Sequence, residues 1–477
     1  MPDAVNELIE QHAATRMFDG DHTLWSPDPT EIANRLGWLD EPEHMSSALD
    51  AVQRATDDAK ARGIRHVVWC GMGGSSLFPE LLAGSALVAT DAPSFTVLDT
   101  SHPAAIARAA EAADAVSTLY VFASKSGGTL ETRSQLDFFW ARSGDPAHFA
   151  VVTDAGSALD KLATERGFSA VHHATPTIGG RYSALSHFGV VAASLLGVDV
   201  TEMLDAARAM AAECRADAAA NPGLQLGALL GGSAREGRDK AVLDAPAAFA
   251  QWLEQLIAES TGKHDKGILP VPGDVSDADG PDRVRVSYGR GGDLDLGAAD
   301  VTSDAATLGR EVMRWEIATA LAGAVLQINP FDQPDVEAAK QAASKVLAEG
   351  PGDIPTVPLT DALDGAGPGR YVALQAFVDP DGPVARSLGD RRIAVRDRTG
   401  AAATAAIGPR YLHSTGQLHK GGPPSGTFVQ MLDADLPHLA IPGRDYGFHD
   451  LITAQAAGDY AALRARGRAV ARVATDW

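Results

Sequence analysis

The chain has 477 residues, 45% of them hydrophobic and 21% charged, which is the composition of a globular protein too long for one core. Its formal net charge of −22 argues against nucleic acid or an anionic membrane surface as a partner. The two cysteines, Cys70 and Cys214, exclude a disulfide scaffold and a cysteine-rich zinc site.

Short helices are expected in residues 1–45, where the polar start does not resemble a signal peptide. No apolar run is long enough to predict a membrane span, and the low number of cysteines fits a reducing cytosol, so we expect a cytoplasmic protein. In residues 46–200 apolar strands alternate with helices, which predicts a parallel doubly wound sheet. The predicted strands are His66–Cys70, Phe95–Leu98, Thr118–Ala123, Phe149–Thr153 and Ala170–His173.

A second α/β unit is predicted in residues 201–350. Lys240–Leu243 has the pattern of a strand, and Asp244 is a natural N-cap for a helix that runs to Glu259 and stops at Gly262. Residues 351–477 contain three more strand candidates and are expected to complete this second domain. The three candidates are Tyr371–Phe377, Arg392–Val395 and Thr427–Leu432.

The most informative loop runs from Ser124 to Thr132 and follows the buried strand Thr118–Ala123. Its glycines let the backbone approach a ligand, and the next helix offers free N–H groups and the positive end of its dipole. Hydroxyl groups add further donors, so the loop predicts a pocket for a phosphate monoester. An ordinary capped turn is the alternative, because Ser and Thr are common N-caps. The candidate phosphate ligands are Ser124, Lys125, Ser126 and Thr129.

A second loop, Gly71–Ser76, follows the first predicted strand. It resembles a dinucleotide loop, with Asp99 placed where a ribose-binding acid would stand, but Ser76 occupies the position of the third glycine. A phosphosugar lying across both loops explains the pair better, and it makes Gly73, Gly74 and Ser75 candidate ligands. A nicotinamide enzyme remains an alternative.

Four further stretches carry groups suited to metal-free proton transfer beside a carbonyl. Their candidates are an arginine, a carboxylate, lysines, a glutamine and histidines. The stretches are Gly179–Ser183 with Gly180 and Arg181, Glu259–Lys263, Asn329–Lys340 with Gln333, and Tyr411–Lys420 with His413 and His419.

Together the segments SKSGGTLET, GGRYS, ESTGK, NPFDQPDVEAAK and LHSTGQLHKGG resemble the phosphoglucose isomerase family. The likeness is closest to the isomerase half of bacterial transaldolase–phosphoglucose isomerase fusions and covers the chain from about Glu43 onward. It implies two sugar-isomerase (SIS) domains of flavodoxin-like architecture. The implied activity is the reversible conversion of glucose 6-phosphate and fructose 6-phosphate, a step of glycolysis and gluconeogenesis, by a homodimer without a cofactor or metal.

The resemblance also implies roles for individual residues. Ser75, Ser124, Ser126 and Thr129 would hold the phosphate. Glu259 would carry a proton between C1 and C2 through a cis-enediolate that Arg181 stabilises, while His413 and Lys340 would open the sugar ring. His419, six residues after His413, is the competing candidate for ring opening.

Two positions depart from the family. Gly128 stands where threonine is more common and Gly127 where a larger residue is more common, so the loop has one hydroxyl donor fewer. The alternative functions are an isomerase that accepts another sugar phosphate, such as mannose 6-phosphate, and an SIS-domain sensor without turnover. The pair His172-His173 is expected to be structural, because neighbouring strand residues face opposite ways.

Overall fold

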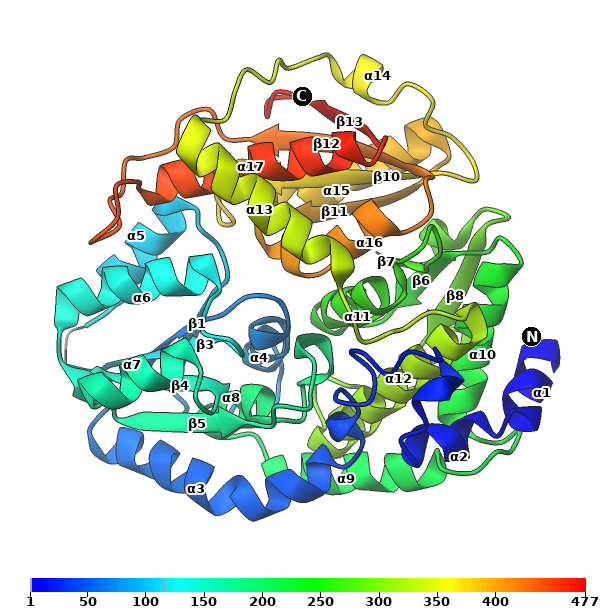
Figure 1. Cartoon of the computed structure of the whole chain (residues 1–477), viewed down its shortest axis with the longest axis horizontal. Coiled ribbons are helices and arrows are strands. Elements are labelled where there is room, and N and C mark those ends of the chain that lie inside the picture. Colours follow the sequence, from blue (N-terminus) through cyan, green and yellow to red (C-terminus); the bar gives the residue numbers. More distant parts are fainter. Residues whose placement is uncertain (1, 115) are drawn as a thin grey trace.

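Figure 1 shows the computed structural model of the chain, which describes residues 2–114 and 116–477, with the backbone alone at residues 2 and 336–340. The N-terminal region forms α1 (Pro2–Glu10) and α2 (Ala13–Phe18), as expected, and Trp25 anchors it by donating from Nε1 to the carbonyl of Ala320 at 2.8 Å. Among the helices of these ranges, none combines the length and the apolar composition needed to cross a membrane.

The first sheet has five parallel strands in the order β2-β1-β3-β4-β5, which is the flavodoxin-like order. Its central strand β3 is buried along its whole length, in line with its unbroken apolar sequence. The five strands are β1 (His66–Cys70), β2 (Ser94–Leu98), β3 (Thr118–Ala123), β4 (Phe149–Asp154) and β5 (Ala170–Ala174).

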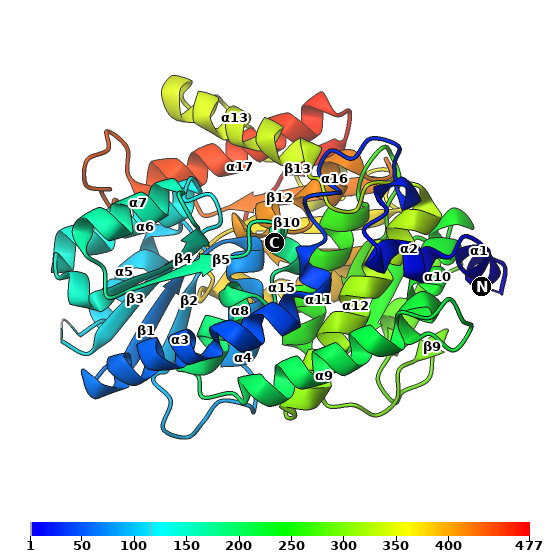
Figure 2. The ribbon, with the colours of Figure 1, turned by 60° about the horizontal axis from the view of Figure 1, so that its bottom comes forward.

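Alternate residues of these strands pack on opposite helix layers, which Figure 2 shows above and below the sheet. In β3, Leu119 and Val121 join the core with α3, α4 and α8, while Tyr120 and Phe122 join the core with α5, α6 and α7. The six helices are α3 (Glu41–Ala61), α4 (Leu77–Ala83), α5 (Pro103–Ala112), α6 (Leu130–Ser143), α7 (Ala158–Arg166) and α8 (His187–Leu195).

The second sheet has four parallel strands in the order β7-β6-β8-β9. Its strands are β6 (Lys240–Asp244), β7 (Leu269–Pro272), β8 (Arg283–Ser287) and β9 (Leu294–Asp295). One face of β6 packs into the core shared with its helices, which are α9 (Val200–Glu213), α10 (Pro222–Arg235), α11 (Ala247–Thr261) and α12 (Ala305–Leu326).

The C-terminal strands form a third parallel sheet of their own, in the order β11-β10-β12-β13. Its strands are β10 (Tyr371–Phe377), β11 (Ala402–Ile407), β12 (Gly426–Leu432) and β13 (Ala469–Arg472). Its helices are α13 (Pro334–Glu349), α14 (Leu359–Ala362), α15 (Pro383–Thr399), α16 (Gly416–Gly421) and α17 (Phe448–Ala465).

Two prolines explain why the second and third sheets stay separate. Leu269 of β7 donates its N–H to the carbonyl of Asp239, just before β6, at 2.7 Å, whereas Pro270 and Pro272 have no N–H to donate on the other side of β7. The two sheets instead share an apolar core in which Val242 and Val271 meet Tyr371 and other residues of the third sheet. The α/β class with parallel sheets is confirmed, and the C-terminal segment contributes a complete sheet to it.

Two local predictions were wrong. Residues 392–395 lie in α15, which begins at Pro383 after Gly382 and buries Leu388 and Val395, two helical turns apart, on one side. The short alternation in Arg392–Val395 imitated a strand, because a four-residue pattern cannot exclude a helix. Asp244 ends β6 instead of capping α11, and its carboxylate binds Arg285 at 2.5 Å and Arg290 at 2.8 Å.

Candidate active site

The hydroxyl-rich loop lies between β3 and α6, at the carboxyl end of the central strand of the first sheet. Thr129 is the N-cap residue of α6, yet its hydroxyl makes no capping bond and lies 3.1 Å from Ser124 Oγ. Ser126 is exposed and accepts the N–H of Gly128 at 3.2 Å. The first N–H groups of α6 therefore have no side-chain cap, and this favours an anion site over the capped-turn alternative.

Lys125 is already engaged within the protein. Its Nζ lies 2.8 Å from Asp154 Oδ2 and donates to the carbonyl of Pro176 at 2.9 Å. The structure thus gives Lys125 a part in holding the loop in place, and the predicted phosphate contact would come from its neighbours.

The glycine loop after β1 lies beside the first loop, because β1 and β3 are adjacent in the sheet. A Cβ at Gly74 would lie 1.9 Å from the carbonyl oxygen of Gly180, so only glycine permits this approach. Gly73 has φ +57°, and a Cβ there would lie 2.6 Å from the carbonyl oxygen of His413. Ser75 is half-buried next to this junction. The glycines therefore bring the Arg181 and His413 segments to the candidate phosphate loops.

The structure argues against a nicotinamide site, because Asp99, the acid that would bind the ribose, is already engaged by another residue. Asp99 is buried and binds Arg410, with 2.7 Å between Asp99 Oδ2 and Arg410 Nε. The same guanidinium donates to Glu80 at 2.7 Å. Asp99 therefore fixes the segment before His413 to the first domain.

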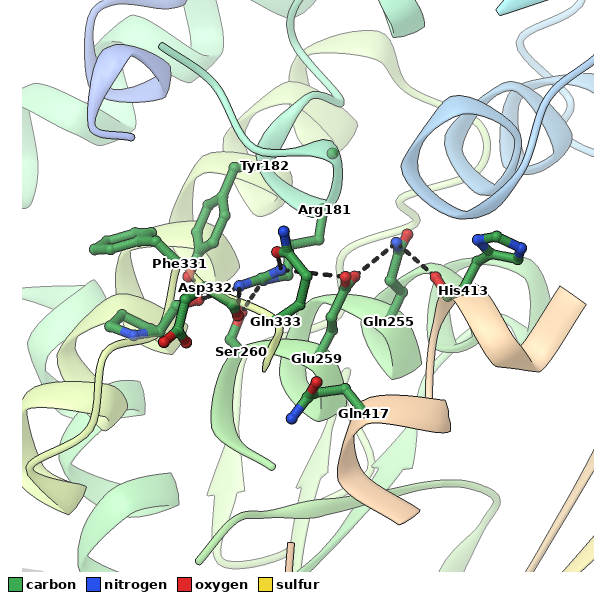
Figure 3. A network of polar contacts seen from close by, with 12 residues as sticks. Arg181, Tyr182, Gln255, Glu259, Ser260, Phe331, Asp332, Gln333, His413 and Gln417 are labelled. Atoms are coloured by element: carbon green, nitrogen blue, oxygen red, sulfur yellow. Dashed lines mark hydrogen bonds and ion pairs between the residues drawn. The ribbon is translucent and has the colours of Figure 1, made fainter. Parts of the chain in front are cut away.

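Arg181 stands at the centre of the predicted chemistry and is buried (Figure 3). Its guanidinium donates to Ser260 Oγ at 2.9 Å and to the carbonyls of Pro330 at 2.7 Å and Asp332 at 2.8 Å. Gln333 Oε1 accepts from its Nη1 at 3.0 Å. So many partners fix the orientation of the cation and join the GGRYS, ESTGK and NPFDQP segments.

Glu259 lies beside this cation, near the C-terminal end of α11. Its Oε1 is 3.3 Å from Arg181 Nη1, and its side chain is 12% exposed, so the carboxylate is held in place and still reachable. A carboxylate at a helix C-terminus is disfavoured by the helix dipole. Arg181 offsets that effect and makes this position available to a base.

Gln255 is a site residue that the sequence analysis missed. Its Nε2 donates to Glu259 Oε2 at 2.9 Å and to the carbonyl oxygen of His413 at 2.9 Å, and Figure 3 shows the amide between the two residues. It precedes Glu259 by four residues on α11, so helical periodicity alone places it on the same face.

His413 lies in a short 3₁₀ turn after β11, and its Nε2 is 2.9 Å from Glu131 Oε1. Glu131 was also missed as a partner, although it stands in the SKSGGTLET segment. The competing candidate, His419, is buried in α16 between Tyr371 and Phe428, and its Nδ1 lies 3.2 Å from the Tyr371 hydroxyl. Burial, with Lys420 adjacent, lowers the pKa of His419 to about 3. The geometry favours His413 over His419 for proton transfer.

The NPFDQP segment enters the site through Gln333, and Lys340 follows it on α13, where its side chain lies outside the described residues. Lys263 also holds this segment: its buried Nζ is 2.5 Å from the carbonyl oxygen of Asn329 and 2.7 Å from Asp332 Oδ1. Burial, with Arg181 nearby, lowers the pKa of Lys263 to about 7. Among the described residues, no group of three or more His, Cys, Asp or Glu side chains could hold a metal ion.

Comparison with known proteins identifies the family that the chain resembles. A family model described as phosphoglucose isomerase matches residues 33–267. The glucose-6-phosphate isomerase of Nostoc punctiforme is 33% identical over 263 residues, which cover 51% of this chain and 49% of that protein. That of a Synechococcus strain is 28% identical over 402 residues and covers 69% of this chain and 75% of its own length. The chain spans about half the length of the first curated relatives it matches.

Solved structures agree on the fold. A hypothetical protein from Thermus thermophilus is 24% identical with a TM-score of 0.64, covering 73% of this chain and 97% of its own. A glucose-6-phosphate isomerase from Chlamydia trachomatis is 21% identical with a TM-score of 0.54, covering 72% of this chain and 79% of its own. The matched region 33–267 includes both candidate phosphate loops, Arg181 and Glu259. Over this region the chain matches the phosphoglucose isomerase family.

Proposed function

We propose that this protein interconverts glucose 6-phosphate and fructose 6-phosphate by proton transfer between C1 and C2. The observation that supports this most directly is the placement of Glu259. Its two oxygens are held by Arg181 and Gln255, near the two candidate phosphate loops. A base fixed in this way, next to a cation and an anion site, is what an enediolate reaction needs.

In this mechanism the uncapped N-terminus of α6 and the hydroxyls of Ser75, Ser124, Ser126 and Thr129 bind the phosphate. His413 and Lys340 move the proton that opens the sugar ring. Glu259 then takes the proton from C2 of the open aldose and returns it to C1. Arg181, already fixed by Ser260 and two carbonyls, stabilises the negative charge that develops on the enediolate oxygens.

The test is a coupled assay of the purified protein with fructose 6-phosphate, with and without EDTA. We expect turnover to glucose 6-phosphate that a chelator leaves unchanged. Activity lost in EDTA and restored by a divalent ion would replace the enediolate path with a metal-assisted hydride shift. Binding of the sugar phosphate without any turnover would favour the sensor.

The same assay with mannose 6-phosphate decides the substrate range. The homodimer and the cytoplasmic location implied by the resemblance are part of the proposal. Sedimentation analysis of the purified protein tests the dimer.

A further inference from the structure

The hydrogen bond of His413 determines which ring nitrogen can act. Its Nε2 lies 2.9 Å from Glu131 Oε1, and a carboxylate only accepts hydrogen bonds. Nε2 therefore carries the proton of the neutral ring and Nδ1 carries the lone pair. A group that fixes Glu131 also fixes the tautomer and the direction of this lone pair.

Gln455 of α17 is such a group. Its Nε2 donates to Glu131 Oε1 at 2.6 Å, the same oxygen that His413 binds, and the residue is only 4% exposed. The other end of the amide is also satisfied, since Ser101 Oγ donates to Gln455 Oε1 at 2.5 Å. Because Ser101 occupies the amide oxygen, the NH₂ end must face Glu131.

The helix that carries Gln455 is fixed to the His413 segment at a second point. One turn further along α17, the buried Asp459 accepts the Tyr411 hydroxyl at 2.7 Å and lies 2.5 Å from Lys420 Nζ. Tyr411 and Lys420 lie on either side of His413 in the chain. Residues on one face of α17 therefore hold both the backbone segment around His413, through Asp459, and the partner of its ring, Glu131, through Gln455.

We propose that Gln455, supported by Ser101, is a positioning residue that sets the tautomer and orientation of His413 through Glu131. The inference rests on the proposed function, because it assigns His413 a ring-opening step that Gln455 makes efficient. Gln455 comes from the C-terminal helix and Ser101 from the loop after β2, so this chain of hydrogen bonds also joins the third sheet to the first.

The test is Gln455→Met, which keeps the length of the side chain and removes the donor. We expect kcat for glucose 6-phosphate to fall about 10- to 100-fold, the range for a misplaced catalytic group, with KM changed less than about threefold. Exchange of the C1 proton of 5-deoxyfructose 6-phosphate, which cannot close the furanose ring, should stay within about twofold of wild type, since Glu259 performs it. Ser101→Ala should give a smaller defect of the same kind.

Thr453→Val is the matched control, because it lies on the same helix and its hydroxyl bonds within that helix, to the carbonyl of His449. Equal losses of turnover and exchange in Gln455→Met, or no loss in either, would overturn the inference. A second readout does not depend on activity: nitrogen-15 spectra, assigned with His413→Ala, should show the Nε2–H tautomer in wild type and a mixture in Gln455→Met. If wild type has no isomerase activity, the proposed function fails and these spectra alone decide the role of Gln455.

Discussion

Glu259 illustrates how single contacts turn an ordinary residue type into a candidate base. It lies near the end of a helix with an apolar face, and it is held between the Arg181 guanidinium and the Gln255 amide. Each oxygen has one fixed donor, so the carboxylate has little freedom to rotate. This preorganisation reduces the reorganisation that proton transfer requires.

Replacing this carboxylate should abolish turnover while preserving binding. In Glu259→Gln we expect kcat to fall by about 10²–10⁴-fold, because an amide cannot accept the C2 proton. Sugar-phosphate affinity, measured by calorimetry, should stay within about threefold. Glu254→Gln, on the same helix, is the control and should remain active. A Glu259→Gln enzyme with more than about a tenth of wild-type kcat would refute the assignment.

Replacing His413 and replacing His419 should have different effects, the first on turnover and the second on stability. His413→Ala should depress turnover of glucose 6-phosphate strongly and leave C1 proton exchange of an open-chain analogue intact, because the ring-opening group is lost. His419→Ala should instead lower the free energy of unfolding by about 2–4 kcal/mol, since it leaves a cavity between Tyr371 and Phe428. Chemical denaturation together with the two activity assays separates these outcomes. A selective ring-opening defect in His419→Ala would reverse the roles.

At the scale of the element, the β3–α6 turn shows why its two glycines are not equivalent. Gly127 has φ +67°, and a Cβ there would lie 2.5 Å from the backbone nitrogen of Leu159, so the start of α7 leaves no room for a side chain. At Gly128 the nearest atom to a Cβ would be Ser126 Oγ, 3.6 Å away. Only Gly127 is required by the fold of the turn.

We therefore expect Gly128→Thr to fold normally and to bind phosphate more tightly, because it adds a hydroxyl donor beside the N-terminus of α6. One such hydrogen bond is worth about 0.5–1.5 kcal/mol, which corresponds to a roughly two- to tenfold lower Kd for inorganic phosphate. Gly127→Ala should lower the unfolding midpoint. Calorimetric titration and thermal melts of the pair test this. Weaker phosphate binding in Gly128→Thr would show that its side chain points away from the anion.

In the whole molecule, α4 and α11 lie at the centre between the three sheets (Figure 1), and ion pairs and an aromatic contact join the parts around them. Arg410 connects the His413 segment to Asp99 and Glu80, and Arg108 of α5 binds Asp379, just after β10, at 2.5 Å. Phe78 of α4 packs on Trp252 of α11. These contacts place the carboxyl ends of β1 and β3 opposite α11, so the site depends on the assembly of the domains.

The free energy of unfolding should depend on pH through Glu41. This residue starts α3 and accepts the Thr175 hydroxyl at 2.8 Å. Burial raises the pKa of Glu41 from 4.5 to about 7. The folded state therefore binds this proton more tightly than the unfolded state, and stability falls as pH rises from 4.5 to about 7. Glu41→Gln should remove this loss and stabilise the protein at pH 8 by about 1–3 kcal/mol.

Urea denaturation at pH 5 and pH 8 provides the measurement. Glu43→Gln, two residues along the same helix and exposed, should show no such pH-dependent gain. A Glu41→Gln variant that is equally destabilised at both pH values would show that the carboxyl group stabilises the fold in its charged form.

Local sequence was enough to predict the parallel α/β class, the first sheet and the hydroxyl-rich turn. An unbroken apolar strand such as Thr118–Ala123, followed by glycines and hydroxyls, specifies both the strand and the helix N-terminus after it. Gly262 and the apolar face of α11 likewise placed Glu259 near a helix end. Gln255 could have been predicted from the same helical period.

Features that depend on partners distant in the chain became known only from the folded molecule. The pairing of His413 with Glu131, 282 residues apart, and the engagement of Lys125 by Asp154 and Pro176 have no local signature. The separate third sheet is consistent with Pro270 and Pro272 in β7, whose missing N–H groups matter only because β11 of the third sheet lies beside β7. Residues 392–395 form part of a helix because Leu388 and Val395 pack into the core of the third sheet. A four-residue pattern cannot predict that packing.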